Sequence, residues 1–445
     1  MTAHSYRENL QRAAFPFHYH LRMAATPTQS LVLSFEDARR VVEDHASRRF
    51  LPARETIDLL HAAGRILAEP ISADRDFPPF PRSTRDGYAV RASDLVRPPA
   101  MLTVIGEIKA GPLPGRAPLR LNPGEAVSIM TGAPVPPGAD AIVMIEYTSL
   151  HDGRVEIAKT VAPGENIVAQ GAEAKRGSRL LNRGTRLKEA AIALAASVGS
   201  SRLQVFVRPS VAVLTTGDEI VEVDAEIGPM QIRNSNSYSL AAQIQQAGGE
   251  PVLLPNAPDE PRRLRQLIEQ GLQADLLLMT GGVSMGRYDL VEQVLTEMEA
   301  EFFFTGAKIQ PGRPVVFGRV SRAAAGGPSA ELSHKYFFGL PGNPVSTMVT
   351  FELFARPLLE ALAGMPPPPL AFLHARLKSE IRVKPGLKRF LPAIVSGQYE
   401  NSQAELVSWQ GSGDIASIVR SNSLIVVPAD REHISAGEWV AVMLR

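Results

Sequence analysis

Residues 208–364 alternate between short apolar segments and segments with helical spacing, and this pattern constrains the fold more than any other feature. It predicts strands at 211–215, 251–255, 275–280 and 335–340, and helices at 237–247, 260–272, 290–298 and from about 343 to 362. Strands that alternate with helices of about ten residues are typical of a parallel sheet covered on both faces. We therefore expect an α/β domain over 208–364.

The segments on either side of this domain have different patterns. Residues 76–170 hold short apolar runs between Pro and Gly clusters, which predicts a small β-rich domain. A helix is expected over 34–67, with Ser34 as its N-cap, and another at 189–198. Four consecutive prolines follow Met365 and end the α/β domain. In a chain of 445 residues we expect several domains: a poorly ordered extension (1–33), a connecting helical/extended domain (34–75 and 171–207), the β-rich domain (76–170), the α/β domain (208–364) and a C-terminal β-domain (365–445).

Charge and composition limit the possible partners. The chain carries 47 basic and 46 acidic side chains, so its formal charge of +1 gives no reason to expect nucleic acid or a membrane surface. No apolar run approaches the length of about 18 residues that a membrane span needs, and we expect a cytoplasmic protein. The chain has no cysteine, which excludes disulfides, thiolate metal ligands and a cysteine nucleophile. The histidines show no zinc-protease spacing.

Three glycine-rich turns, the first at 216–219, the second at 280–286 and the third at 341–346, directly follow predicted strands. In a parallel sheet such turns gather at the carboxyl ends of the strands, where ligands bind. Glycine lets backbone N–H groups approach an anion, and a helix start adds a favourable dipole. The turns match neither a Walker A loop nor a dinucleotide motif, but together they predict a phosphate-bearing ligand. The candidate phosphate-binding residues are Thr216, Gly217, Asp218, Gly281, Gly282, Ser284, Gly286, Pro341, Gly342, Asn343 and Ser346.

Four carboxylates lie beside these turns: Asp218, Glu219, Asp259 and Asp289. Carboxylates next to phosphates usually hold Mg²⁺, a hard cation that prefers oxygen ligands. We expect magnesium at Glu219, Asp259 and Asp289. The alternative is that Asp259 and Asp289 only cap the helices that follow them.

Two further features admit two interpretations each. Asp86-Gly87 follows a proline-rich stretch, and Thr131 lies in a similar loop. Either loop can be a simple β-turn, or the two polar groups can line the far wall of a cleft. Arg313, with Lys308 and Arg319 nearby, can supply positive charge for a tetrahedral oxyanion or remain a solvated surface residue.

Six motifs occur in an order that identifies a family. The chain closely resembles the MoeA family of molybdopterin molybdenumtransferases, which includes the C-terminal domain of gephyrin, from about residue 34 to the C-terminus. The motifs lie at 83–89, 129–134, 216–219, 231–236, 281–286 and 341–346.

The resemblance implies a homodimer of elongated, four-part subunits whose α/β domain resembles the domain that adenylylates molybdopterin. It implies that adenylylated molybdopterin is cleaved in the presence of molybdate and a divalent cation, giving molybdenum cofactor and AMP. Carried over by motif, the catalytic candidates are Asp86, Thr131, Glu219, Asp259 and Asp289. Asp86 and Thr131 of one subunit would face the α/β domain of the other. Molybdopterin adenylyltransferase and molybdoenzyme maturation proteins are the possible further partners.

Several positions depart from the family pattern, and they leave the choice between molybdate and tungstate open. They are Pro81, Thr84, Arg85, Ser128, Asn166, Gln310 and Arg313. Two other functions remain as alternatives: a non-catalytic scaffold of the same fold, and a competence-type nucleotide hydrolase that shares the α/β domain. The Asp86 and Thr131 loops argue against the hydrolase.

Overall fold

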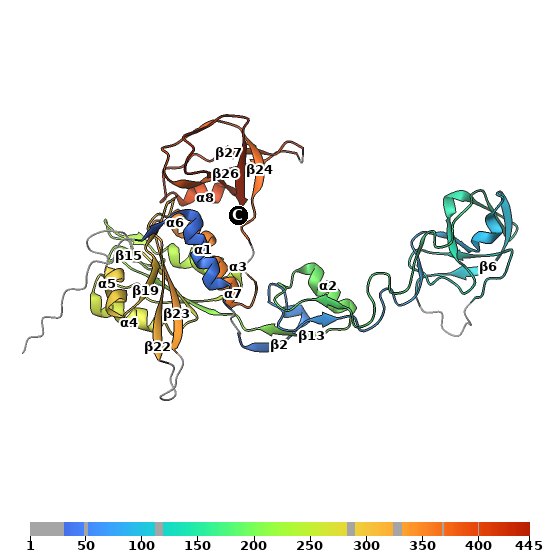
Figure 1. Cartoon of the computed structure of the whole chain (residues 1–445), viewed down its shortest axis with the longest axis horizontal. Helices are drawn as coiled ribbons and strands as arrows, with labels where there is room; N and C mark the ends of the chain where they lie inside the picture. The colour runs from blue at the N-terminus through green and yellow to red at the C-terminus, as the bar shows by residue number, and fades with distance from the viewer. Residues whose placement is uncertain are drawn as a thin grey trace, which may run out of the picture.

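The computed structural model describes residues 31–48, 52–111, 119–282, 290–323, 332–366, 369–398 and 400–445. The molecule is elongated (Figure 1): the α/β domain and the C-terminal β-domain lie together at one end, and a six-stranded β-domain lies at the other. A narrow connecting part that contains α2 joins the two ends. In the described residues, no helix combines the length and the apolar character needed to cross a membrane.

A six-stranded sheet forms the centre of the α/β domain. Its strands, in spatial order, are β17 (Glu250–Leu253), β14 (Ser210–Thr215), β18 (Leu276–Thr280), β23 (Leu332–Leu340), β22 (Val316–Ala323) and β19 (Glu301–Phe304). The first four are parallel, as predicted. The last two strands, β22 and β19, were not predicted. They run antiparallel to their neighbours, since β22 and β23 pair as a hairpin and β19 pairs with β22.

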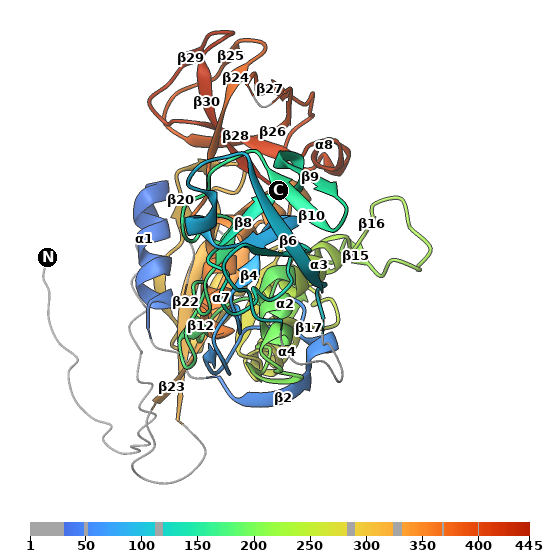
Figure 2. The same ribbon diagram turned by 90° about the vertical axis from the view of Figure 1, so that its right-hand side faces the viewer.

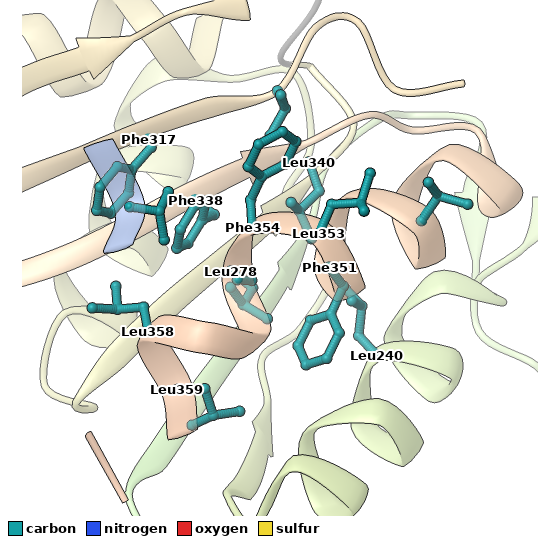
Figure 3. Close-up of a cluster of buried hydrophobic side chains, with 14 of the residues drawn as sticks. Leu240, Leu278, Phe317, Phe338, Leu340, Phe351, Leu353, Phe354, Leu358 and Leu359 are labelled. Atoms are coloured by element: carbon teal, nitrogen blue, oxygen red, sulfur yellow. The ribbon is translucent and has the colours of Figure 1, made fainter. Parts of the chain in front are cut away.

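Helices cover both faces of this sheet. On one face lie α3 (Asn236–Ala247), α6 (Pro344–Thr350) and α7 (Arg356–Leu362), the last two joined by the π-helical turn η4 (Phe351–Ala355). On the other lie α4 (Pro261–Gly271) and α5 (Leu290–Glu297). Side chains of one strand alternate between the two cores, as Leu277 and Leu278 do. Figure 3 shows the first core, to which Leu240 and Leu359 of the helices and Leu278 and Phe338 of the sheet all belong.

The first helix belongs to this core as well. In α1 (Phe35–Ala46) the Ser34 hydroxyl accepts a bond from the Asp37 N–H (3.0 Å), which confirms the predicted cap, and Phe35 packs into the core. Just before it, β1 (Val32–Leu33) pairs with β20 (Gly306–Ala307). Because its buried side chains pack into this core, α1 lies with the α/β domain. The helix ends at Ala46, so the prediction of a helix to 67 was wrong.

The connecting part begins with β2 (Arg54–Asp58), which pairs with β13 (Arg202–Phe206) and is followed by the single turn η1 (Leu59–His61). This pairing with a strand far along the chain satisfies the backbone of residues that were expected to be helical. A second pair, β3 (Ile71–Ser72) with β12 (Arg179–Leu181), and helix α2 (Glu189–Ser197) complete this part.

The two remaining domains are built from antiparallel and mixed sheets. The distal domain contains, in order, β8 (Ala141–Met144), β5 (Gly87–Val90), β7 (Glu125–Ile129), β6 (Ala100–Ile108), β10 (Arg154–Ile157) and β9 (Thr148–His151). The C-terminal domain contains β26 (Lys388–Ser396), β27 (Gln403–Leu406), β24 (Leu373–Leu377), β30 (Trp439–Leu444), β28 (Ser423–Val427) and helix α8 (Ile415–Arg420), with β21 (Ile309–Gln310) added at its edge.

Candidate active site

The three glycine-rich turns meet at the carboxyl ends of β14, β18 and β23, as the sequence predicted. They surround a pocket of about 440 Å³. Its wall includes the predicted residues Thr216, Gly217, Glu219, Asp259, Gly281, Gly282, Pro341, Gly342 and Asn343. Three predicted residues, Ser284, Gly286 and Asp289, lie outside the described residues.

The first two turns touch through their backbones. Thr216 donates its N–H to the Thr280 carbonyl (3.0 Å), and Gly281 follows with a φ of +91°. A Cβ atom at Gly281 would collide with the Thr216 carbonyl oxygen. Glycine is therefore required at position 281 both for its conformation and for the close approach of the turns.

The second and third turns are joined by Asn236, the first residue of α3. Its Nδ2 donates to the Gly342 carbonyl oxygen (2.7 Å) and to Thr280 Oγ1 (3.0 Å). Thr280 Oγ1 in turn donates to the Pro341 carbonyl (3.1 Å). Because a carbonyl oxygen only accepts, the bond to Gly342 fixes which end of the amide faces the turn. Asn236 thus keeps the second and third turns at a fixed distance from each other.

A second asparagine, Asn234, joins the end of β14 to the start of α3 beside the pocket. Asn234 is buried and donates to Thr215 Oγ1 (3.1 Å) and Ser237 Oγ (3.0 Å). Sequence reasoning noted the motif at 231–236 but assigned no site residue in it. The pattern that could have indicated these two residues is Asn-Ser-Asn at the start of a helix that begins beside the glycine turns.

The third turn leads into α6 as expected, with one difference. Asn343 occupies the N-cap position and Pro344 the first helical position, but the Asn343 side chain makes no capping hydrogen bond. Asn343 instead contributes to the walls of two cavities.

Carboxylates gather at the mouth of the pocket. Asp218 accepts a bond from the Asp259 N–H (3.0 Å). Loss of surrounding water, together with the nearby charges of Asp218 and Glu219, raises the pKa of Asp259. The N-cap of α4 is Glu260, so the alternative that Asp259 caps this helix was wrong. The mutual repulsion of these carboxylates favours a cation among them.

The predicted magnesium ligands are only partly described. Glu219 and Asp259 line the same pocket, while Asp289 is outside the described residues. In the part of the chain that the structure describes, no group of three or more His, Asp or Glu side chains is arranged to hold a metal. Mg²⁺ is commonly held by one or two carboxylates together with substrate phosphates and water, and the chemistry of Glu219 and Asp259 fits that mode.

A second cavity of about 410 Å³ adjoins the first and shares Pro314, Pro341 and Asn343 with it. Arg313 and Ser346 line this second cavity rather than the first. Trp409 and Ser412 of the C-terminal domain also line it.

Of the three basic residues expected near this turn, Arg313 alone contributes to the wall. Arg319 forms an ion pair with Glu301 (2.6 Å) between neighbouring strands, and Lys308 lines neither of the two cavities. The positive charge available to an oxyanion in the second cavity therefore comes from Arg313.

Asp86 and Thr131 bond to each other on the distal domain. One Asp86 carboxylate oxygen accepts from the Thr131 N–H (2.7 Å) and the Thr131 hydroxyl (2.8 Å), and these bonds lower the pKa of Asp86. Gly87 begins β5, and a Cβ there would collide with the Val143 carbonyl. The Asp86 turn is therefore held by two hydrogen bonds and by close packing against β8. The distal domain that carries this turn lies at the opposite end of the molecule from the α/β domain that carries the glycine turns, so one chain does not bring them together (Figure 1).

Comparison with known proteins identifies the family. Residues 33–199 match the MoeA N-terminal region (domain I and II), residues 212–361 a probable molybdopterin binding domain, and residues 374–444 the MoeA C-terminal region (domain IV).

Relatives named molybdopterin molybdenumtransferase include one from Nostoc, 36% identical over 87% of this chain and 88% of its own. Another, from Haemophilus influenzae, is 34% identical over 87% of this chain and 93% of its own. A MoeA crystal structure from Pyrococcus horikoshii superimposes with a TM-score of 0.73 and 29% identity over 93% of this chain and 100% of its own. The chain therefore belongs to the MoeA family, the molybdopterin molybdenumtransferases of molybdenum cofactor biosynthesis.

Proposed function

We propose that this enzyme inserts molybdate into adenylylated molybdopterin and releases AMP in a magnesium-dependent reaction. The observation that carries the proposal is the pocket in which three glycine turns and the carboxylates Glu219 and Asp259 converge. Backbone N–H groups in glycine turns can bind the pyrophosphate, and preorganised donors stabilise the charge that develops as it is cleaved.

Magnesium, when bound, would be held by Glu219 and Asp259 and would neutralise the pyrophosphate charge. The chain's own residues position the substrate. Asn236 fixes the spacing of the second and third turns, and Gly281 lets the first two approach. A phosphoanhydride bound across these turns is thus held in one orientation for cleavage.

Molybdate is proposed to bind in the second cavity. Arg313 supplies a positive charge there and Ser346 a hydroxyl, and the shared wall of Pro314, Pro341 and Asn343 puts this cavity next to the first. The two dithiolene sulfurs that take the molybdenum belong to the substrate, which suits a chain without cysteine. Tungstate has the same charge and geometry and remains the alternative oxyanion.

The active site is proposed to be completed in a homodimer. Asp86 and Thr131 form a hydrogen-bonded polar pair on the distal domain, at the end of the molecule remote from the α/β domain. In a two-fold dimer each subunit can present this pair to the α/β domain of the other, so two equivalent sites form. Molybdopterin adenylyltransferase is the proposed supplier of the substrate, and molybdoenzyme maturation proteins are proposed to receive the product.

The test is direct measurement of AMP. Purified protein is incubated with adenylylated molybdopterin, molybdate and magnesium, and AMP is quantified by chromatography. We expect AMP release that depends on both molybdate and magnesium. Binding of the substrate without release of AMP would support the scaffold instead, and release of nucleotide from substrates that lack molybdopterin would support the nucleotide hydrolase.

A further inference from the structure

An arm of residues 220–233 projects beside the pocket. It begins with β15 (Ile220–Val221) and ends with β16 (Ile232–Arg233), which pair with each other. Figure 2 shows the arm extending away from the body of the α/β domain. Because Ile220, Ile232 and Arg233 line the pocket, both ends of the arm lie at the pocket mouth.

The arm exposes apolar side chains without packing them against the chain. Met230 is 88% and Ile232 57% exposed, and Val223 and Ile227 are also exposed. None of the four belongs to a hydrophobic cluster formed by the described residues. The arm holds its shape through internal bonds, such as that from the Arg233 guanidinium to the Ala225 carbonyl (3.2 Å). A group of exposed apolar side chains beside a ligand pocket indicates a partner surface.

The arm is also acidic. Glu222, Asp224 and Glu226 are exposed, and none of them forms an ion pair with a residue that the structure describes. Asp218 and Glu219 add negative charge at its base. A partner that fits this surface must therefore carry both apolar side chains and positive charge.

The surface around the Asp86 turn has both properties. Arg85 is exposed, and within the described residues its guanidinium has neither a hydrogen-bond acceptor nor a carboxylate partner. Arg82, by contrast, is neutralised by Glu173 (2.7 Å). Ile145 is 55% exposed and donates its N–H to the Asp86 carbonyl (3.0 Å), so an apolar side chain lies directly beside the turn.

We propose that the arm of one subunit docks on the Asp86 turn of a second copy of this chain, with the acidic side chains against Arg85 and the apolar ones against Ile145. The two surfaces belong to domains at opposite ends of the elongated molecule (Figure 1), so they meet only between copies. The inference rests on the proposed shared site and adds the contact that closes it: the arm brings the Asp86–Thr131 pair over the pocket mouth. In a two-fold dimer the contact forms twice.

The absence of cysteine permits a crosslinking test in the full-length protein. Met230→Cys and Ile145→Cys are made in separately tagged chains, co-expressed, purified through both tags and treated with a short bis-maleimide. We expect a covalent dimer that carries both tags. The control pairs Met230→Cys with Val96→Cys, because Val96 is 72% exposed on the same domain but follows the opposite end of β5. The proposal predicts little or no crosslink in the control.

Charge reversal tests the ionic part of the contact. Arg85→Glu should slow the crosslink at least about fivefold, since like charges would then face each other. Adding Glu222→Lys and Glu226→Lys in the arm should restore the rate. If Arg85 instead binds the anionic substrate, Arg85→Glu will leave the crosslink rate unchanged and the arm variants will rescue nothing, which overturns the ionic contact.

A monomeric protein, or a dimer in which the Met230–Ile145 pair links no better than the control pair, would overturn the docking proposal. Neither experiment requires turnover. A crosslink without AMP release would therefore contradict the proposed function alone, whereas AMP release without a crosslink would contradict the arm contact alone.

Discussion

Replacing Asn236 with alanine removes the bridge between the second and third glycine turns. The variant loses the bonds from Nδ2 to the Gly342 carbonyl (2.7 Å) and to Thr280 Oγ1 (3.0 Å). A net hydrogen bond contributes roughly 1 kcal/mol, so the two together contribute about 2 kcal/mol to the stability of this region. Gly342 also loses its side-chain donor, and the third turn is freed to move away from the second.

Loss of the bridge should impair function as well as stability. If the turns bind the pyrophosphate together, their separation should raise the KM for adenylylated molybdopterin about tenfold, which corresponds to about 1.4 kcal/mol. Asn236→Asp should be worse than Asn236→Ala, because it places a carboxylate against the Gly342 carbonyl and near the phosphate. Stability is measured by urea unfolding and KM by AMP release.

A matched control exists in the C-terminal domain. The Asn422 side chain also makes two hydrogen bonds, both with the backbone of Val395: it donates to the carbonyl (2.9 Å) and accepts from the N–H (2.8 Å). Asn422→Ala should lower stability by a similar amount and leave KM unchanged. If Asn236→Ala loses stability but keeps the wild-type KM, the assignment of Asn236 as a positioning residue is refuted.

Three other predictions concern single side chains. Glu219→Gln should fold normally and release AMP roughly 10²-fold more slowly, and full activity at limiting magnesium would remove Glu219 from the site. Asp86→Asn keeps an acceptor for Thr131, so it should lower AMP release while changing the free energy of unfolding by no more than about 0.5 kcal/mol; early melting with normal activity per folded molecule would show a structural turn only. Burial, aided by Arg48 and Arg319, lowers the pKa of His45 from 6.5 to about 4. The unfolded chain therefore takes up a proton first, and stability should fall between pH 6.5 and about 4 by at most about 3 kcal/mol. His45→Phe should flatten that part of the curve of unfolding free energy against pH, and an unchanged slope would contradict the assignment.

The sequence predicted those strands and helices whose formation depends on residues close together in the chain. Strands such as β14 and β18 are short apolar runs bounded by glycine turns, and they were predicted to within a residue or so. The helix expected over 34–67 ended at Ala46 because β2 pairs with β13, about 150 residues further along the chain. A pairing partner so distant leaves no periodic signal in the sequence.

The residues of the candidate site likewise fall into those that the sequence predicted and those that depend on contacts between distant segments. The glycine turns follow strands and could be found from sequence, whereas the function of Asn236 depends on a bond to Gly342, more than 100 residues away. Asp259 precedes a helix and resembled a cap, but its position beside Asp218 is set by the return of the chain after β17. The bond between Asp86 and Thr131 likewise depends on the pairing of β5 with β7.

The most direct test of the whole account is complementation between two inactive variants. Asp86→Asn and Glu219→Gln chains with different tags are co-expressed, doubly tagged dimers are purified, and AMP release is measured. In a shared site both lesions fall in one of the two sites and the other is intact, so the heterodimer should recover about half of wild-type activity while each homodimer is nearly inactive. Verified heterodimers as inactive as the two homodimers would place Asp86 and Glu219 in the site of one subunit and contradict the shared active site.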